Sequence, residues 1–182
     1  MDSYIKLIEF KTKNKKIYWI SKRYFDIFVS IFLLPLFFIL WFTLKILNKF
    51  INPGPIFFTQ RRMGKDCISF QAIKFRSMTD DENILRGYND PIERNRITPL
   101  GKFLRSYRLD ELPQIINVLK GDMSLIGPRP DYYEHALVFS EKIKDYRSRH
   151  LIRPGISGLS QIRLGYAEGL EATKKKTAVD QY

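Results

Sequence analysis

The chain has 182 residues, which is enough for one domain with a modest core but not for two full domains. Its net charge of +12 points to an anionic partner: nucleic acid, anionic lipid or a phosphorylated substrate. A single cysteine, Cys67, excludes an internal disulfide framework. The two histidines, His135 and His150, lack metal-ligand spacing with it, which argues against a zinc site.

The N-terminal part predicts contact with a lipid bilayer. Residues 1–20 combine aromatic and aliphatic side chains with lysines, which indicates a basic interfacial arm or, alternatively, a solvated tail. Ile27 to Leu44 follows without a charge, close to the about 20 residues that a transmembrane helix needs. It has no small-residue cleavage site, and it is apolar on every side, which fits lipid better than the core of a soluble protein.

The flanks and the middle of this segment favour re-entry over a full span. Lysines and arginines lie on both sides, and basic flanks tend to stay in the cytoplasm. Pro35 sits near the middle, where proline removes a helical hydrogen bond and kinks the helix. We therefore expect residues 21–51 to form a bent helix that enters and leaves the membrane on one side.

Residues 52–182 are expected to form the globular domain, after a chain break at Asn52–Pro55. Ile56–Gln60 and Ser69–Phe75 predict two strands of a hairpin. Residues 79–96 are polar and charged, which is typical of a mobile loop, here a candidate lid.

Three helices are expected after that loop, in a mainly helical α+β fold that is seated on the membrane. They cover Pro99–Tyr107, Asp110–Lys120 and about Asp131–Arg147. The second should begin near Asp110, because Pro113 suits a first turn, and should end at Gly121.

Adjacent carboxylates, Asp110 and Glu111, stand at the expected start of that second helix. Free N–H groups and a partial positive charge at a helix start would keep a carboxylate ionised and attract anions. Arg105, Arg108 and Arg129 flank the pair, so the region predicts a site for phosphate and a divalent metal. The alternative is simple capping, since Asp and Glu are common in first turns.

Several motifs in order resemble those of the bacterial sugar transferases, the monotopic phosphoglycosyl transferase family. They are Lys22-Arg23-Tyr24-Phe25-Asp26, the segment from Gly54 to Gly64, Lys74-Phe75-Arg76-Ser77-Met78, Asp110-Glu111, Gly121-Asp122-Met123-Ser124, Gly127-Pro128-Arg129-Pro130 and Arg153-Pro154-Gly155-Ile156-Ser157-Gly158. The resemblance covers roughly residues 20–165.

The resemblance implies transfer of a sugar 1-phosphate from a UDP-sugar to undecaprenyl phosphate, early in the synthesis of a surface glycan such as capsule or lipopolysaccharide. It implies Asp110 as the nucleophile, which would carry the phospho-sugar, and Glu111 as a ligand of Mg²⁺. Arg105 and Arg129 are expected to bind substrate phosphates. Lys74 and Arg76 share one face of the second strand and are candidates for the same role, with a solvated strand face as the alternative.

The resemblance also implies a place and partners. The catalytic domain would lie on the cytoplasmic face of the bacterial inner membrane, with the bilayer, the nucleotide sugar and the lipid phosphate as partners. We expect no nucleic-acid partner, because the aromatic residues do not interleave with arginines on a stacking platform. The sequence leaves the oligomeric state open, a homo-oligomer included.

Some positions depart from the family pattern. Leu34 replaces the usual serine before Pro35, and Leu159-Ser160-Gln161 and Arg163-Leu164-Gly165 differ from the usual segments after the last motif. The family also continues past Asp180-Gln181-Tyr182, so a C-terminally truncated form is expected. The alternatives to an active enzyme are a membrane-tethered basic binding module and an inactive scaffold of the same fold.

Overall fold

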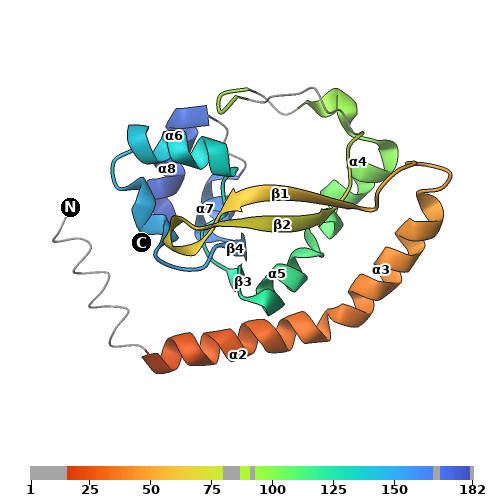
Figure 1. The fold of residues 1–182 in the computed structure, drawn as a ribbon, viewed down its shortest axis with the longest axis horizontal. Helices are drawn as coiled ribbons and strands as arrows, with labels where there is room; N and C mark the ends of the chain where they lie inside the picture. The colour runs from red at the N-terminus through yellow and green to blue at the C-terminus, as the bar shows by residue number, and fades with distance from the viewer. Residues whose placement is uncertain (1–15, 80–86, 91–92, 166–168, 181–182) are drawn as a thin grey trace.

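The computed structural model describes residues 16–79, 87–90, 93–165 and 169–180. The fold is mainly helical with little β-structure, as the sequence predicts (Figure 1). The α-helices are α2 (Lys16–Phe32), α3 (Leu34–Leu47), α4 (Pro99–Ser106), α5 (Gln114–Lys120), α6 (Tyr133–Lys142), α7 (Leu159–Leu164) and α8 (Gly169–Asp180). The strands are β1 (Phe57–Met63), β2 (Ser69–Phe75), β3 (Ser124–Ile126) and β4 (Gly155–Ser157). Short 3-10 turns are η1 (Lys65–Cys67), η2 (Arg94–Arg96), η3 (Leu109–Glu111) and η4 (Tyr146–His150).

Parts of three predictions lie outside the described residues. They are residues 1–15 of the basic arm, residues 80–86 and 91–92 of the candidate lid, and the end of the chain at 181–182. The described part of the lid region includes Tyr88, whose ring packs edge-on against Phe139 of α6 at 5.9 Å.

The predicted hairpin is confirmed. β1 and β2 pair antiparallel, with Phe57 opposite Phe75 and Met63 opposite Ser69. The first strand ends at Met63 and not at Gln60, because Arg61 and Arg62 also pair with residues of β2. A second, parallel pair of β3 and β4 was not predicted, since strands of three residues carry no alternation long enough to recognise.

The predicted third helix is too long. α6 ends at Lys142 because the backbone of Ile143 is extended, and the left-handed Asp145, with a φ of 60°, then precedes η4.

The predicted kink near Pro35 is confirmed. α2 and α3 are bent by 41° across Leu33, and Pro35 lies in the first turn of α3. No single helix of the described residues is long and apolar enough to cross a membrane, but this bent pair meets the criterion together, by length and composition only. The pair runs along the lower edge and right side of the molecule in Figure 1.

α2 turns its polar side chains toward the protein and its apolar side chains outward. Asp26 is buried, and its carboxylate accepts hydrogen bonds from the Ser124 hydroxyl at 2.8 Å, the Leu125 amide at 3.2 Å and the Lys22 ammonium at 3.3 Å. Lys22 also contacts the Ser124 hydroxyl. The exposed apolar residues of the helix include Phe25, Phe28, Ile31 and Phe32. This polar contact fixes α2 to β3.

Arg23 adds a second contact between α2 and the globular domain. Its guanidinium donates to the carbonyls of Val118 at 2.7 Å and Leu119 at 3.2 Å. These carbonyls lie in the last turn of α5, where helical carbonyls carry partial negative charge, and that of Val118 also accepts from the Gly121 N–H.

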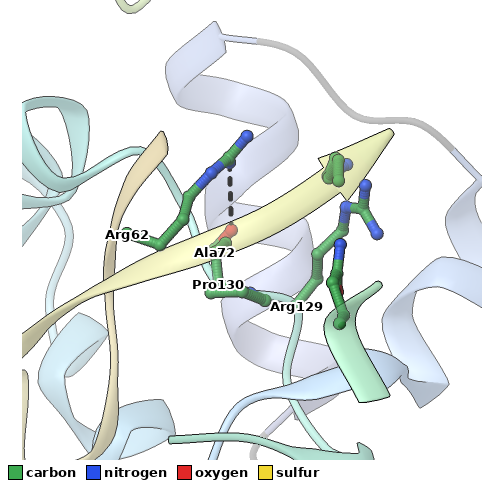
Figure 2. A pocket seen from close by; sticks show the side chains of 6 residues that line it. Arg62, Ala72, Arg129 and Pro130 are labelled. Atoms are coloured by element: carbon green, nitrogen blue, oxygen red, sulfur yellow. Dashed lines mark hydrogen bonds between the residues drawn. The ribbon is translucent and has the colours of Figure 1, made fainter. Parts of the chain in front are cut away.

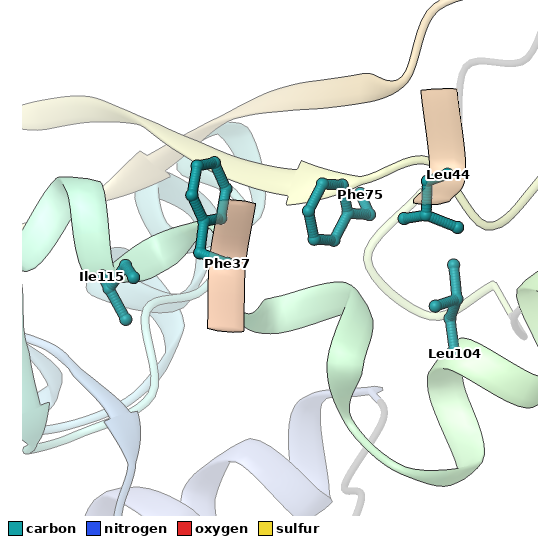
Figure 3. Close-up of a cluster of buried hydrophobic side chains, with 5 residues drawn as sticks. All are labelled: Phe37, Leu44, Phe75, Leu104 and Ile115. Carbon is teal, nitrogen blue, oxygen red and sulfur yellow. The ribbon is translucent and has the colours of Figure 1, made fainter. Parts of the chain in front are cut away.

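α3 joins the main hydrophobic core through one face. Phe37 and Leu44 pack with Phe75 of β2, Leu104 of α4 and Ile115 of α5 (Figure 3). The rings of Phe37 and Phe75 are stacked at 5.8 Å. The bent helix pair is therefore part of the core that supports β2 and α5.

We predict that Asp26→Asn lowers the thermal stability of the protein in detergent micelles. The amide would place an NH₂ group among three donors and remove the charge, and a hydrogen bond to a charged group contributes about 1.5–3 kcal/mol. The midpoint of thermal unfolding should fall by about 5 °C. The control is Glu171→Gln, at an exposed carboxylate of α8. Equal midpoints for the two variants would contradict the role of Asp26.

Candidate active site

The two carboxylates lie in the 3-10 turn η3, not at the start of an α-helix. Glu111 N–H bonds to the Arg108 carbonyl and Leu112 N–H to that of Leu109, both three residues back. Pro113 has no N–H to continue an α-helical pattern, so α5 begins only at Gln114. The predicted start at Asp110 is therefore wrong. Because the N–H groups of Glu111 and Leu112 are already bonded, the positive charge around the pair comes from side chains.

Glu111 is held by three basic side chains. It is 4% exposed, and its Oε1 lies 2.7 Å from Lys74 Nζ and 2.6 Å from Arg129 Nη2. Its Oε2 has longer contacts, to Arg129 Nη1 at 3.3 Å and Arg108 Nη1 at 3.8 Å. Burial alone would raise the pKa of Glu111, but Lys74 and Arg129 outweigh it and lower the pKa to about 2. Glu111 is thus ionised at any physiological pH.

Asp110 has a different environment, although it is the neighbouring residue. It is 8% exposed, and none of the described residues donates a hydrogen bond or forms an ion pair to its carboxylate. Burial raises the pKa of Asp110, the charge of Glu111 adds to this, and Lys74, Arg105 and Arg129 oppose it. The pair therefore consists of one carboxylate engaged by cations and one that is uncommitted and more basic than usual.

Two further predicted cations, Lys74 and Arg105, come from different elements. Lys74 comes from β2, and burial lowers its pKa to about 8, although the charge of Glu111 acts in the opposite direction. Arg105 comes from the last turn of α4, and its charge lowers the pKa of Asp110. The fold thus brings Lys74, Arg105 and Arg129 around Asp110 and Glu111.

Arg76 does not join this group. It is buried, and it donates to the carbonyls of Asn52 at 2.5 Å, Pro55 at 2.7 Å and Pro53 at 2.8 Å. A Cβ on Gly54 would meet the Arg76 guanidinium at 3.0 Å, which shows how closely this loop wraps the side chain. We therefore leave Arg76 out of the site: it ties the end of α3 to the end of β2.

A buried charged cluster holds the chain from the Arg129 carbonyl to Asp131. Arg149 donates to the Arg129 carbonyl at 2.9 Å and pairs with Asp131 at 2.5 Å and Asp180 at 2.8 Å. The Tyr146 hydroxyl donates to Asp131 at 2.7 Å. Burial would raise the pKa of Asp131, but Arg149 and neighbouring cations hold it well below its usual range. The sequence analysis missed this cluster, because its members come from η4, α8 and a loop and follow no periodic pattern.

A small pocket opens beside Lys74 and Arg129. Its lining residues are Arg62, Ala72, Lys74, Gln114, Arg129 and Pro130 (Figure 2). Arg62 Nη1 donates to the Pro130 carbonyl at 3.1 Å, drawn as the dashed line in Figure 2. Arg62 and Gln114 were not predicted as site residues. The signal for Gln114 was its spacing, because residues three and four positions apart share a helical face and Gln114 follows Glu111 by three.

The residues of the pair suit a Mg²⁺ ion that is shared with a substrate. Among the described residues, no group of three or more His, Cys, Asp or Glu side chains could hold a metal. Mg²⁺, however, is often bound by one or two carboxylates together with substrate phosphates. The Asp110 carboxylate and Glu111 Oε2, whose contacts with Arg129 and Arg108 are longer than those of Oε1, could be the two carboxylate ligands of such an ion.

The arrangement can perform chemistry on a phosphate ester. An uncommitted carboxylate of raised basicity is a suitable nucleophile, and adjacent cations can offset the negative charge of an approaching phosphate.

Comparison with known proteins identifies the family. The family model described as bacterial sugar transferase matches residues 17–182. The chain is 42% identical over 166 residues to the UDP-N-acetylgalactosamine-undecaprenyl-phosphate N-acetylgalactosaminephosphotransferase of Aeromonas hydrophila, covering 91% of this chain and 39% of that protein.

Two UDP-glucose:undecaprenyl-phosphate glucose-1-phosphate transferases are also similar. The Klebsiella pneumoniae protein is 39% identical, with 88% of this chain and 35% of that protein covered. The Caulobacter vibrioides protein is 36% identical, with 88% and 61% covered. The chain thus spans only part of the length of these relatives. The match over nearly all of its own length shows that the chain belongs to the bacterial sugar transferase family.

Proposed function

We propose that the chain transfers a sugar 1-phosphate from a UDP-sugar to undecaprenyl phosphate, with Asp110 as the covalent nucleophile. The observation that carries the proposal is the contrast within the pair: Glu111 is bound by cations, whereas Asp110 has no partner among the described residues. The substrates are taken from the names of the relatives, which include sugar phosphotransferases that act on undecaprenyl phosphate.

The proposed reaction has two steps. A carboxylate oxygen of Asp110 attacks the phosphorus next to the sugar, the bond to the bridging oxygen breaks, and UMP leaves with that electron pair. An oxygen of undecaprenyl phosphate then attacks the same phosphorus. The bond to Asp110 breaks, so the carboxylate is regenerated and the sugar is linked to the lipid through a diphosphate.

The surrounding charges serve this reaction, because nucleophile and substrate are both anionic. Lys74, Arg105 and Arg129 would lower the repulsion between Asp110 and the diphosphate and bind the oxygens on which charge develops. Glu111 would orient Lys74 and Arg129 through its short contacts. Mg²⁺, when bound by Glu111 and substrate, would supply further charge neutralisation.

The bent helix pair supports a place at the membrane. An outward apolar face on α2, above a buried polar face, is expected where the surrounding medium is lipid. We propose that α2 and α3 form a re-entrant helix and that the globular domain lies at the cytoplasmic face of the bacterial inner membrane. The product would then enter the synthesis of a surface polysaccharide, a role supported by the relative named as an exopolysaccharide production protein in Rhizobium leguminosarum.

The first prediction concerns UMP release. Protein in nanodiscs, given undecaprenyl phosphate, Mg²⁺ and a panel of UDP-sugars, should release UMP from at least one donor. Asp110→Asn should lower the rate by at least about 10³-fold, because the amide is not a nucleophile. Chelation with EDTA should abolish release, and added Mg²⁺ should restore it.

The matched control is Asp122→Asn, a carboxylate beyond α5 that bonds to Asn117 at 3.1 Å. Release that persists in Asp110→Asn would exclude Asp110 as the nucleophile. Absence of release from folded wild type with every donor would favour an inactive scaffold.

The second prediction concerns pH. Lys74 must be protonated to bind an anionic donor, and its pKa lies at about 8. Donor kcat/KM, which reports the free enzyme, should therefore fall as pH rises through about 8. In Lys74→Arg, donor kcat/KM should no longer fall with rising pH up to about pH 10, because a guanidinium stays protonated. If donor kcat/KM of Lys74→Arg still falls near pH 8 as in wild type, the titrating group is not Lys74.

A further inference from the structure

Gln114 is a buried polar side chain without a function in the reaction as proposed above. It is 3% exposed and lies at the first position of α5. No described residue forms a hydrogen bond with its carboxamide, yet the side chain lines the pocket beside Arg129. Its carboxamide borders the open space of the pocket and is not fully enclosed by protein. A ligand that fills the pocket would provide the missing partner.

The chemistry of the pocket selects a negatively charged oxygen. Three of the six lining residues are basic, namely Arg62, Lys74 and Arg129, and the described lining includes no acidic residue. The carboxamide NH₂ is a donor, as are ammonium and guanidinium groups. The space between these side chains is small, about enough for one water-sized group. One phosphoryl oxygen has that size, whereas a whole phosphate group or a sugar ring does not.

The position of the pocket links it to the carboxylate pair. Lys74 and Arg129 line the pocket and also bind Glu111. Gln114 lies one helical turn beyond Glu111, with Pro113 restricting the backbone between them. An oxygen in the pocket would therefore belong to a phosphate whose other atoms lie toward Asp110 and Glu111.

We propose that the pocket of Arg62, Lys74, Gln114 and Arg129 is a subsite for one phosphoryl oxygen of a substrate, and that Gln114 donates a hydrogen bond to it. The identification of the ligand as a substrate rests on the proposed function. Two substrates carry the required group: the nucleotide diphosphate and the polyprenyl phosphate. In either case Gln114 would fix the orientation of that phosphate.

Binding without turnover tests this proposal independently of the proposed reaction. The probes are UDP and a short-chain polyprenyl phosphate, each titrated calorimetrically into the full chain in nanodiscs. Gln114→Met keeps the approximate shape of the side chain but removes the donor. Its Kd for one of the two probes should rise about tenfold, the effect of losing one hydrogen bond to a charged group. The matched control, Gln71→Met, changes an exposed glutamine of β2 and should bind both probes as wild type does.

Gln114→Glu provides a second variant, in case Gln114→Met does not fold. It places a carboxylate in the pocket and should weaken the same probe more strongly. A loss confined to UDP assigns the subsite to the nucleotide sugar, and a loss confined to the polyprenyl phosphate assigns it to the lipid. Both probes binding to folded Gln114 variants within twofold of wild type would overturn the proposal and leave a water molecule as the occupant. Wild type that binds a probe but releases no UMP would count against the proposed reaction, not against the subsite.

Discussion

The site depends on one interaction, the contact of Glu111 with Lys74 and Arg129. The three residues come from η3, β2 and the loop before α6, so this ion-paired group determines how three separate parts of the chain meet. A buried carboxylate without cations would be strongly disfavoured, and two cations without it would repel each other. Because Glu111 satisfies both cations, Asp110 remains uncommitted beside them.

The elements near the proposed membrane support both cations that bind Glu111. Phe37 of α3 stacks on Phe75, the residue after Lys74, and so helps to fix the end of β2. Asp26 of α2 bonds to Ser124 and Leu125, at the start of the segment that leads to Arg129. The bent helix pair is therefore structurally continuous with the site, and a change in its packing should be felt there.

On the other side of the site, the buried pairs of Arg149 with Asp131 and Asp180 hold the backbone around Arg129. Such pairs are strongly destabilising when one partner is removed, because the other charge stays buried. They fix the position of the loop, whereas Lys74, Arg129 and Gln114 line the pocket that the substrate would enter.

The sequence predicted the features that depend on local patterns. The hairpin followed from two strand-like runs, the kink from Pro35 and the end of α5 from Gly121, which has a φ of 94°. The carboxylate pair, Arg105 and Arg129 were predicted from their closeness in the chain and Lys74 from its strand face, and the resemblance to the family supplied their roles. The role of Arg76 could not be predicted, because alternation places a side chain on a face but does not say which carbonyls it will meet.

Contacts between segments that are distant in the sequence could not be predicted either. The bond from Asp26 to Ser124 and the cluster around Arg149 join residues that no motif connects. Gln114 was visible as part of the motif around Asp110, but its place in the wall of the pocket is evident only in three dimensions. The 3-10 turn at Asp110 was missed because Pro113 is compatible both with an α-helix that begins near Asp110 and with one that begins after Pro113.

The most direct test of the account is the mass of the intact protein after incubation with the reactive UDP-sugar and Mg²⁺, without lipid phosphate. We predict an increase equal to one sugar phosphate, located on the peptide that contains Asp110 and removed when undecaprenyl phosphate is added. UMP release without any such adduct, or an adduct on another residue, would contradict covalent catalysis by Asp110.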